Sequence, residues 1–277
     1  MAGLFDLVGL LLQHHPLDFS IADPMEQFEI VDIIPLKIGD INISFSNAAL
    51  SMAMVLLVAC AFMSLATRKV SLVPGRMQSL GETLHGFVAD TLREMAGNEG
   101  MKFFPYIFTL FLFIFLANLL GLLPTLPGIP HWAHVFTPTS HLAVTLTLAM
   151  ITILIVIVYG LYKNGFKFFK LFAPSGVPLW LLPLIIVIEF VSFLSRPLSL
   201  AIRLFANMFA GHLILKLFAG FTIALLGAAG AMKGLAIFPI LGSVAVYLLE
   251  ILVAFLQAYI FAVLSSMYLG DALHPDH

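Results

Sequence analysis

The chain has 277 residues, of which 61% are hydrophobic and only 10% are charged. A soluble domain carries about 25% charged residues, so this composition argues against a soluble fold and indicates an integral membrane protein. The formal net charge of -2 gives no basic footprint for nucleic acid, and the single cysteine excludes an intramolecular disulfide.

The first part of the chain, residues 1–45, is acidic. It holds seven of the 15 acidic residues against one basic residue, Lys37, so we expect an aqueous, non-cytoplasmic tail with short structure around 30–43. Residues 46–66 carry no charge. About 20 apolar residues cross a bilayer core as a helix, so the first transmembrane helix is predicted there.

Residues 67–102 mix charged residues of both signs with apolar residues at three- and four-residue intervals, among them Leu80, Leu84, Phe87, Val88 and Leu92. This spacing predicts an amphipathic helix that lies at the cytoplasmic interface and does not span. A surface for a cytosolic partner is an equally good use of it.

Residues 103–177 predict a transmembrane hairpin with spans at 103–123 and 141–162. The loop between them has no Lys or Arg, whereas Lys163, Lys167 and Lys170 follow the second span. Basic loops favour the cytoplasmic side, which places 67–102 and 163–172 there and leaves 124–140 and the tail on the opposite side.

Residues 178–277 predict a long, bent or tilted helical hairpin. The apolar stretch 179–221 is too long for one upright span, glycines at 220, 227, 230 and 234 predict the turn, and the last helix is expected over 235–269. We therefore expect an all-α membrane protein with about five membrane-crossing helices plus the interfacial helix.

Charged and polar residues interrupt this hairpin, and Arg203 is the most informative of them. A charge at the bilayer centre costs roughly 2.5–3.5 kcal/mol on insertion scales, so it indicates function by default. Glu189, Arg196 and Arg203 are seven residues apart and share one side of a helix, with Asn207 near it and His212 about 180° from Arg203.

The last helix has its own polar stripe, again at seven-residue spacing: Ser243, Glu250 and Gln257. Two antiparallel helices with polar stripes predict an aqueous or hydrogen-bonded path, in which Glu250 meets His212 or an arginine. The alternative is a purely structural buried ion pair that orients the two helices.

The run from Ser195 to Met208 (SRPLSLAIRLFANM) closely resembles the signature of the a subunit of F-type ATP synthases. The last-helix run from Leu256 to Leu264, the run from Asn118 to Pro124, and Pro138-Thr139-Ser140 fit the same family. The resemblance covers about residues 103–270 and leaves the tail out.

The resemblance implies a non-catalytic, proton-translocating stator subunit with two half-channels beside a rotating ring of c subunits. Arg203 matches the family's essential arginine, Asn207 and Gln257 its polar neighbours, and Glu189 an acid of the cytoplasmic path. His212 and Glu250 depart from some bacterial members, in which the acid and the histidine are exchanged between the two helices. The exchange keeps one acid and one base, which supports their proximity.

The expected partners are the c-ring carboxylates, peripheral-stalk b subunits, the whole synthase, the lipid membrane and protons. No cofactor, metal or nucleic acid is expected. The N-terminus does not resemble a transit peptide, which favours the bacterial inner membrane over the mitochondrial one. Sodium-using relatives keep the same arginine, so the sequence leaves the choice between H⁺ and Na⁺ open.

Two other functions fit the sequence less well. A membrane metalloenzyme would use His131, His134 and His141 in or beside one loop, or His14 and His15 in the tail. No acidic ligand accompanies the loop, however, and the sequence contains no H-E-x-x-H helix. A stand-alone secondary ion transporter usually shows internal repeats, and we find none between 48–162 and 178–270.

Overall fold

The computed structural model describes residues 30–34, 37–38, 41–42, 44–68, 71–123, 137–172, 178, 180–228 and 230–273. These residues divide into two compact units. The larger comprises Ile30–Phe209 and Glu250–His277, and the other contains Ala210–Leu249. Each unit is described by itself.

Short strands precede the first of the helices that the structure describes. β1 (Asp32–Ile34) pairs antiparallel with β4 (Phe45–Ser46), and β2 (Lys37–Ile38) pairs with β3 (Ile41–Asn42). The Asn47 backbone N–H donates to the Val31 carbonyl (3.0 Å), and the Val31 N–H donates to the Asn47 side-chain oxygen (3.2 Å). These bonds attach the strands to the start of α2 (Asn47–Thr67).

The helices that follow in the larger unit are α3 (Arg76–Gly100), α4 (Phe104–Gly121) and α5 (Leu142–Asn164). Short 3-10 turns join or extend them: η3 (Met101–Phe103), η5 (Pro138–Ser140) and η6 (Gly165–Phe172). Helices α2, α3 and α4 pack against one another. Gly97 has a φ of 67°, so a kink near the end of α3 lets the chain turn from α3 into α4.

Two long helices complete the chain, α6 (Leu182–Gly227) and α7 (Ile237–Leu273), with η7 (Gly230–Ala236) between them. Pro197 lies inside α6, where it removes one backbone hydrogen bond. The prediction that Gly220 belongs to the turn is wrong. Gly220 lies within α6, because flanking apolar residues continue the helix to Gly227.

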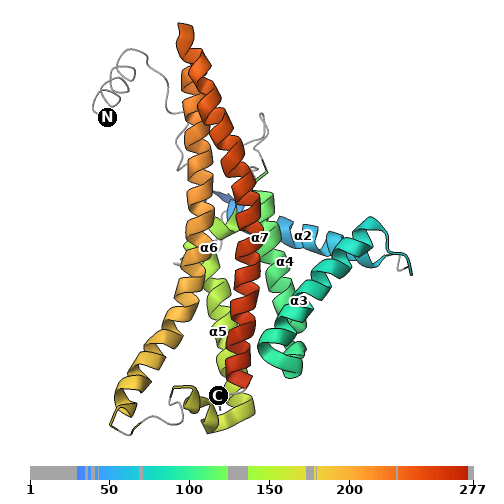
Figure 1. Cartoon of the computed structure of the whole chain (residues 1–277), viewed down its shortest axis with the longest axis vertical. Helices are drawn as coiled ribbons and strands as arrows, with labels where there is room; N and C mark the ends of the chain where they lie inside the picture. Colours follow the sequence, from blue (N-terminus) through green and yellow to red (C-terminus); the bar gives the residue numbers. More distant parts are fainter. Residues whose placement is uncertain are drawn as a thin grey trace. The chain divides into compact units, whose positions relative to one another are not determined.

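The second half of α7 lies beside α4 and α5 (Figure 1). The Phe87 ring of α3 lies 5.8 Å from the Phe255 ring and 5.1 Å from the Tyr259 ring, centroid to centroid. A Cβ on Gly270 would collide with the Met95 carbonyl oxygen. The helices α3 and α7 therefore touch backbone to backbone at Gly270.

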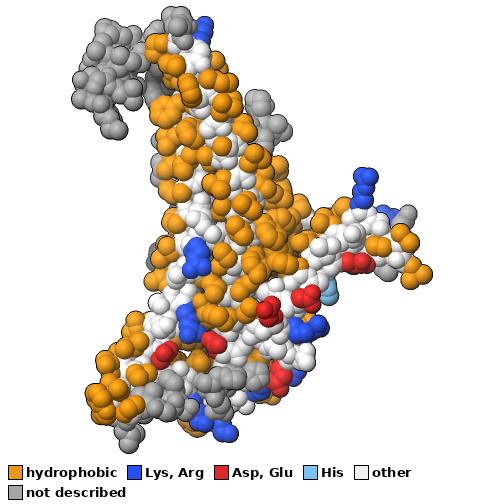
Figure 2. Space-filling view, in the orientation of Figure 1, with side chains coloured by type: hydrophobic (Ala, Val, Ile, Leu, Met, Phe, Trp, Pro, Cys, Tyr) orange, Lys and Arg blue, Asp and Glu red, His pale blue; other side chains and the backbone are white. Residues whose placement is uncertain are grey.

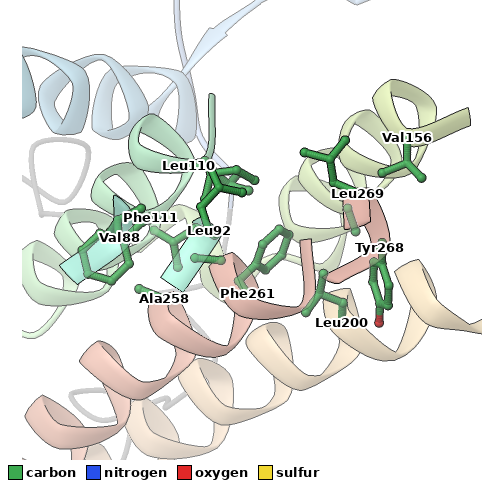
Figure 3. Close-up of a cluster of buried hydrophobic side chains, with 14 of the residues drawn as sticks. Val88, Leu92, Leu110, Phe111, Val156, Leu200, Ala258, Phe261, Tyr268 and Leu269 are labelled. Carbon is green, nitrogen blue, oxygen red and sulfur yellow. The ribbon is translucent and has the colours of Figure 1, made fainter. Parts of the chain in front are cut away.

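The core of the larger unit is formed by side chains from α3, α4, α5, α6 and α7 (Figure 3). Phe111 and Leu92 are fully buried, and Phe261 is 1% exposed. In lipid the helices gain little from hiding apolar surface, so this interdigitated packing is what holds them together.

Five helical segments are long and apolar enough to cross a membrane. They are Asn47–Thr67, Arg76–Gly121, Leu142–Phe172, Leu182–Gly227 and Met232–Leu273. This confirms the predicted fold class, an all-α membrane protein.

In the unit Ala210–Leu249, the end of α6 packs closely on the start of α7. A Cβ on Gly242 would lie 3.1 Å from the Phe218 ring, so the ring would have to shift by a few tenths of an ångström to admit a side chain there.

Candidate functional site

Arg203 lies on the uncovered face of α6. The helix packs into the larger unit through Leu200, Ala201, Leu204 and Met208, all at most 3% exposed. Arg203 is on the exposed side with Ser199, Ile202 and Ala206. Basic side chains interrupt the apolar surface of α6 in the space-filling view (Figure 2). In the described part of the chain, no ion pair involves Arg203.

An arginine in this position needs a partner or water, because its charge is costly inside hydrocarbon. The neighbours on its face are a serine and apolar residues, which cannot neutralise it. The geometry therefore marks the exposed face of α6 around Arg203 as a surface on which an anionic group of another molecule would be stabilised.

Glu189 and Asn207 flank Arg203 on α6, at 14 residues before it and four after it, and both are half-buried. Helical phase places them near the side of Arg203, as the spacing predicts. His212 belongs to the unit Ala210–Leu249, where it is half-buried. The angle of about 180° between Arg203 and His212 stays a prediction from helical spacing.

Glu250 and Gln257 are both buried in the second half of α7, at 6% and 7% exposure. Among the described residues, the Glu250 Oε2 oxygen has no hydrogen-bond partner. A buried carboxyl oxygen without a partner is costly in a purely structural position. Glu250 is therefore a candidate for a group that exchanges a proton.

A buried amide of α4 contacts α7 one turn beyond Glu250. Asn118 of α4 is fully buried and donates its side-chain N–H to the Ala254 carbonyl at 3.4 Å. The Thr139 hydroxyl, also fully buried, donates to the Asn118 side-chain oxygen at 2.6 Å. The sequence drew attention to Asn118 and Thr139 only through a family resemblance. Their hydrogen bonds show that they bring polar groups to the α7 turn that follows Glu250.

Arg196, one heptad before Arg203, has a partner on α7. Its guanidinium Nη1 lies 3.1 Å from the Asp271 Oδ2 oxygen. The sequence predicts that Glu250 of α7 meets His212 or an arginine across the hairpin. Among the described residues the α7 acid in an arginine ion pair is Asp271, because Asp271 lies opposite the Arg196 level of α6.

Sequence reasoning missed Asp271 altogether. The signal was present, since 250, 257, 264 and 271 continue the seven-residue spacing of the α7 stripe, with only Leu264 breaking its polarity. The predicted stripe comprises Ser243, Glu250 and Gln257, and two further seven-residue steps lead to Asp271.

His141 precedes α5, and its carbonyl accepts the Val144 and Thr145 backbone N–H groups. Burial lowers the pKa of its imidazole below the ordinary value. No group of three or more potential metal ligands occurs among the residues that the structure describes. His14, His15, His131 and His134 lie outside those residues.

A multi-pass helical protein that carries an uncovered arginine and buried carboxyl and amide groups within its membrane helices is typical of ion-translocating membrane proteins. Comparison with known families identifies this one. Residues 49–270 match the family model described as ATP synthase A chain, so the chain belongs to that family.

Relatives with similar sequences align with this chain over nearly its whole length. The chain is 51% identical to ATP synthase subunit a of Maricaulis maris (strain MCS10), with 92% of this chain and 98% of the relative covered. It is 53% identical to that of Chelativorans sp. (strain BNC1), over 92% and 99%. It is 54% identical to that of Rhizobium leguminosarum bv. trifolii (strain WSM2304), over 91% and 98%.

Family membership makes the chain a multi-pass membrane component of an ATP synthase, with relatives in bacteria. It therefore argues against the stand-alone transporter that the sequence left open.

Proposed function

We propose that this subunit translocates protons in the stator of the synthase, and that it does so against the carboxylates of a rotating c-subunit ring. The observation that carries the proposal is Arg203, an uncompensated cation, among the described residues, on the uncovered face of a membrane helix. The nucleotide chemistry is left to other subunits, so this chain is a non-catalytic component.

The mechanism follows from the cost of charge in lipid. A ring carboxylate crosses hydrocarbon only when it is neutral, so it must take up a proton before it leaves the stator. Near Arg203 the fixed cation stabilises the ionised carboxylate, and the proton departs. Because a guanidinium keeps its own proton at physiological pH, Arg203 also blocks direct leakage from one side to the other.

Protons then need two separate paths. We assign the non-cytoplasmic path to Glu250 and His212, with Gln257 as a polar neighbour, and the cytoplasmic path to Glu189. Asn207 sits beside Arg203 as a hydrogen-bonding group for the arriving carboxylate. The driving force is about 2.3 kcal/mol per proton for each 100 mV of membrane potential.

The remaining partners follow from charge and position. Acidic and basic side chains gather over α3 (Figure 2), and we assign this polar helix to contact with peripheral-stalk b subunits at the cytoplasmic side. The bacterial relatives favour the cell inner membrane as the location.

The test is Arg203→Ala in the complete synthase, assayed in inverted membrane vesicles for proton-driven ATP synthesis. We expect synthesis to be abolished while the amount of assembled complex is unchanged. Lys167→Ala is the control, because Lys167 is an exposed cation of η6 outside the proposed path. Normal synthesis in the Arg203→Ala complex would refute the proposal.

The transported ion is tested in the same vesicles. ATP-driven pumping that proceeds at full rate without added sodium supports protons. A requirement for sodium would show that the ring carboxylate binds Na⁺ instead.

A further inference from the structure

Helix α6 carries two arginines one heptad apart: Arg196, which is half-buried against α7, and Arg203, which is exposed. Seven residues correspond to about 10 Å along the helix, and the two differ by only about 20° in phase. Any anionic group that slides past this side of α6 would meet both. Of these two arginines, however, only Arg196 has a carboxylate partner among the described residues.

The Arg196 guanidinium is held in place on three sides. Asp271 accepts its hydrogen bond at 3.1 Å, the Tyr268 ring centroid lies 5.2 Å from its central carbon, and the Phe193 ring centroid lies 6.0 Å away. Tyr268 is only 7% exposed, so this ring is itself fixed by packing. The carboxylate balances the charge of Arg196, and the carboxylate and the two rings together orient its guanidinium.

Arg203 has no such arrangement. It lies on the exposed side of α6 and takes part in no ion pair within the described chain. If both arginines only anchored helices, we would expect each of them to have an ion-pair partner.

We propose that Asp271 neutralises Arg196 so that, of these two arginines, only Arg203 acts as a fixed cation for the rotor carboxylate. Asp271 is then a positioning residue, since it acts through Arg196 and touches neither the rotor carboxylate nor the proton. The inference rests on the proposed function, because it presupposes a carboxylate that moves past α6.

The consequence of losing Asp271 follows from Coulomb attraction. A bare Arg196 would be a second binding position for the ionised carboxylate, about 10 Å from the first. The carboxylate would be held between two cations, and its neutralisation and departure would be delayed. Part of the attraction is lost to solvent, so we expect a slowing of about tenfold.

A purely structural pair makes a different prediction. If the ion pair only fastens the end of α7 to α6, removing both charges leaves it unfastened. If Asp271 only compensates Arg196, removing both charges restores a stripe with Arg203 as its active cation. The double variant therefore separates the two roles.

The experiment uses the complete synthase in inverted membrane vesicles and measures proton-driven ATP synthesis per assembled complex. We expect Asp271→Asn to lower the rate about tenfold, and Arg196→Gln/Asp271→Asn to restore it to within about twofold of the original. Asp271→Glu, which keeps the charge, should also stay within about twofold.

An unchanged rate in Asp271→Asn overturns the inference, and so does a double variant as slow as the single one. Loss of assembled complex in Asp271→Asn that the double variant does not repair has the same meaning. These outcomes are separate from the fate of the proposed function, which depends on Arg203→Ala. If Arg203→Ala abolishes synthesis and Asp271→Asn does not slow it, only the present inference is lost.

Discussion

The hydrogen bond from Thr139 to Asn118 ties the segment before α5 to α4, and its removal should lower stability by an amount that can be worked out. The two oxygens are 2.6 Å apart, and both residues are fully buried. Side-chain hydrogen bonds between membrane helices contribute about 0.6 kcal/mol on average and at most about 1.7. A short, fully buried bond belongs in the upper part of that range, so we expect a coupling of about 1–1.5 kcal/mol.

The perturbation is a double-mutant cycle of Asn118→Ala, Thr139→Val and the combined variant. Asn118→Ala alone should cost more than Thr139→Val, because it also removes the 3.4 Å bond to the Ala254 carbonyl. That extra loss is common to two corners of the cycle and cancels in the coupling term. The measured quantity isolates the bond between the two side chains.

The assay is reversible unfolding of the purified subunit in detergent micelles, followed by helical circular dichroism. A coupling below about 0.3 kcal/mol, which is within the additivity expected of independent sites, would refute the assigned hydrogen bond. A larger cost for Thr139→Val than for Asn118→Ala would refute the link between Asn118 and α7.

Two further predictions concern packing and pH. Gly270→Ala should destabilise the subunit by about 1–3 kcal/mol, because its Cβ meets the Met95 carbonyl, whereas Gly220→Ala, which has open space, should be neutral or slightly stabilising. Equal midpoints for the two variants in chemical denaturation would contradict the packing of α7 on α3. Burial lowers the pKa of His141, so as the pH falls below about 6.5 the unfolded chain takes up a proton more readily than the native state, and the native state loses stability from there down to the lowered pKa. His141→Gln should therefore lose less thermal stability than the original protein between about pH 7.5 and about pH 5.5, and parallel curves would show that His141 does not contribute.

Much of the fold could be predicted because membrane helices are recorded locally in the sequence. A run of apolar residues long enough to cross the bilayer predicts each span. The structure confirms the fold class, with five helical segments long and apolar enough to cross a membrane. Basic residues announce the cytoplasmic loops in the same local way, although the sidedness itself stays a prediction. The prediction of a turn at Gly220 was wrong, because a glycine inside an apolar helix is tolerated when its neighbours continue the helical pattern.

The candidate site was predictable only in part. The cost of charge in lipid singles out Arg203, and helical spacing gives the relative directions of Glu189, Asn207 and His212 along α6. Their roles in proton transfer stay a prediction. Helical phase cannot say which face of α6 is covered, because coverage depends on the other helices.

The sequence by itself determined that this is a helical membrane protein with an arginine out of place in a membrane helix, because charge, length and periodicity are properties of short segments. Only the tertiary structure decided that Arg196 is neutralised by Asp271, 75 residues away, and that Arg203 lies on the uncovered face. The tertiary structure alone also shows the hydrogen bond from Asn118 to the Ala254 carbonyl, 136 residues further along the chain. Such contacts depend on the axial register between packed helices, which close approaches such as Gly270 on Met95 establish and which no local pattern records.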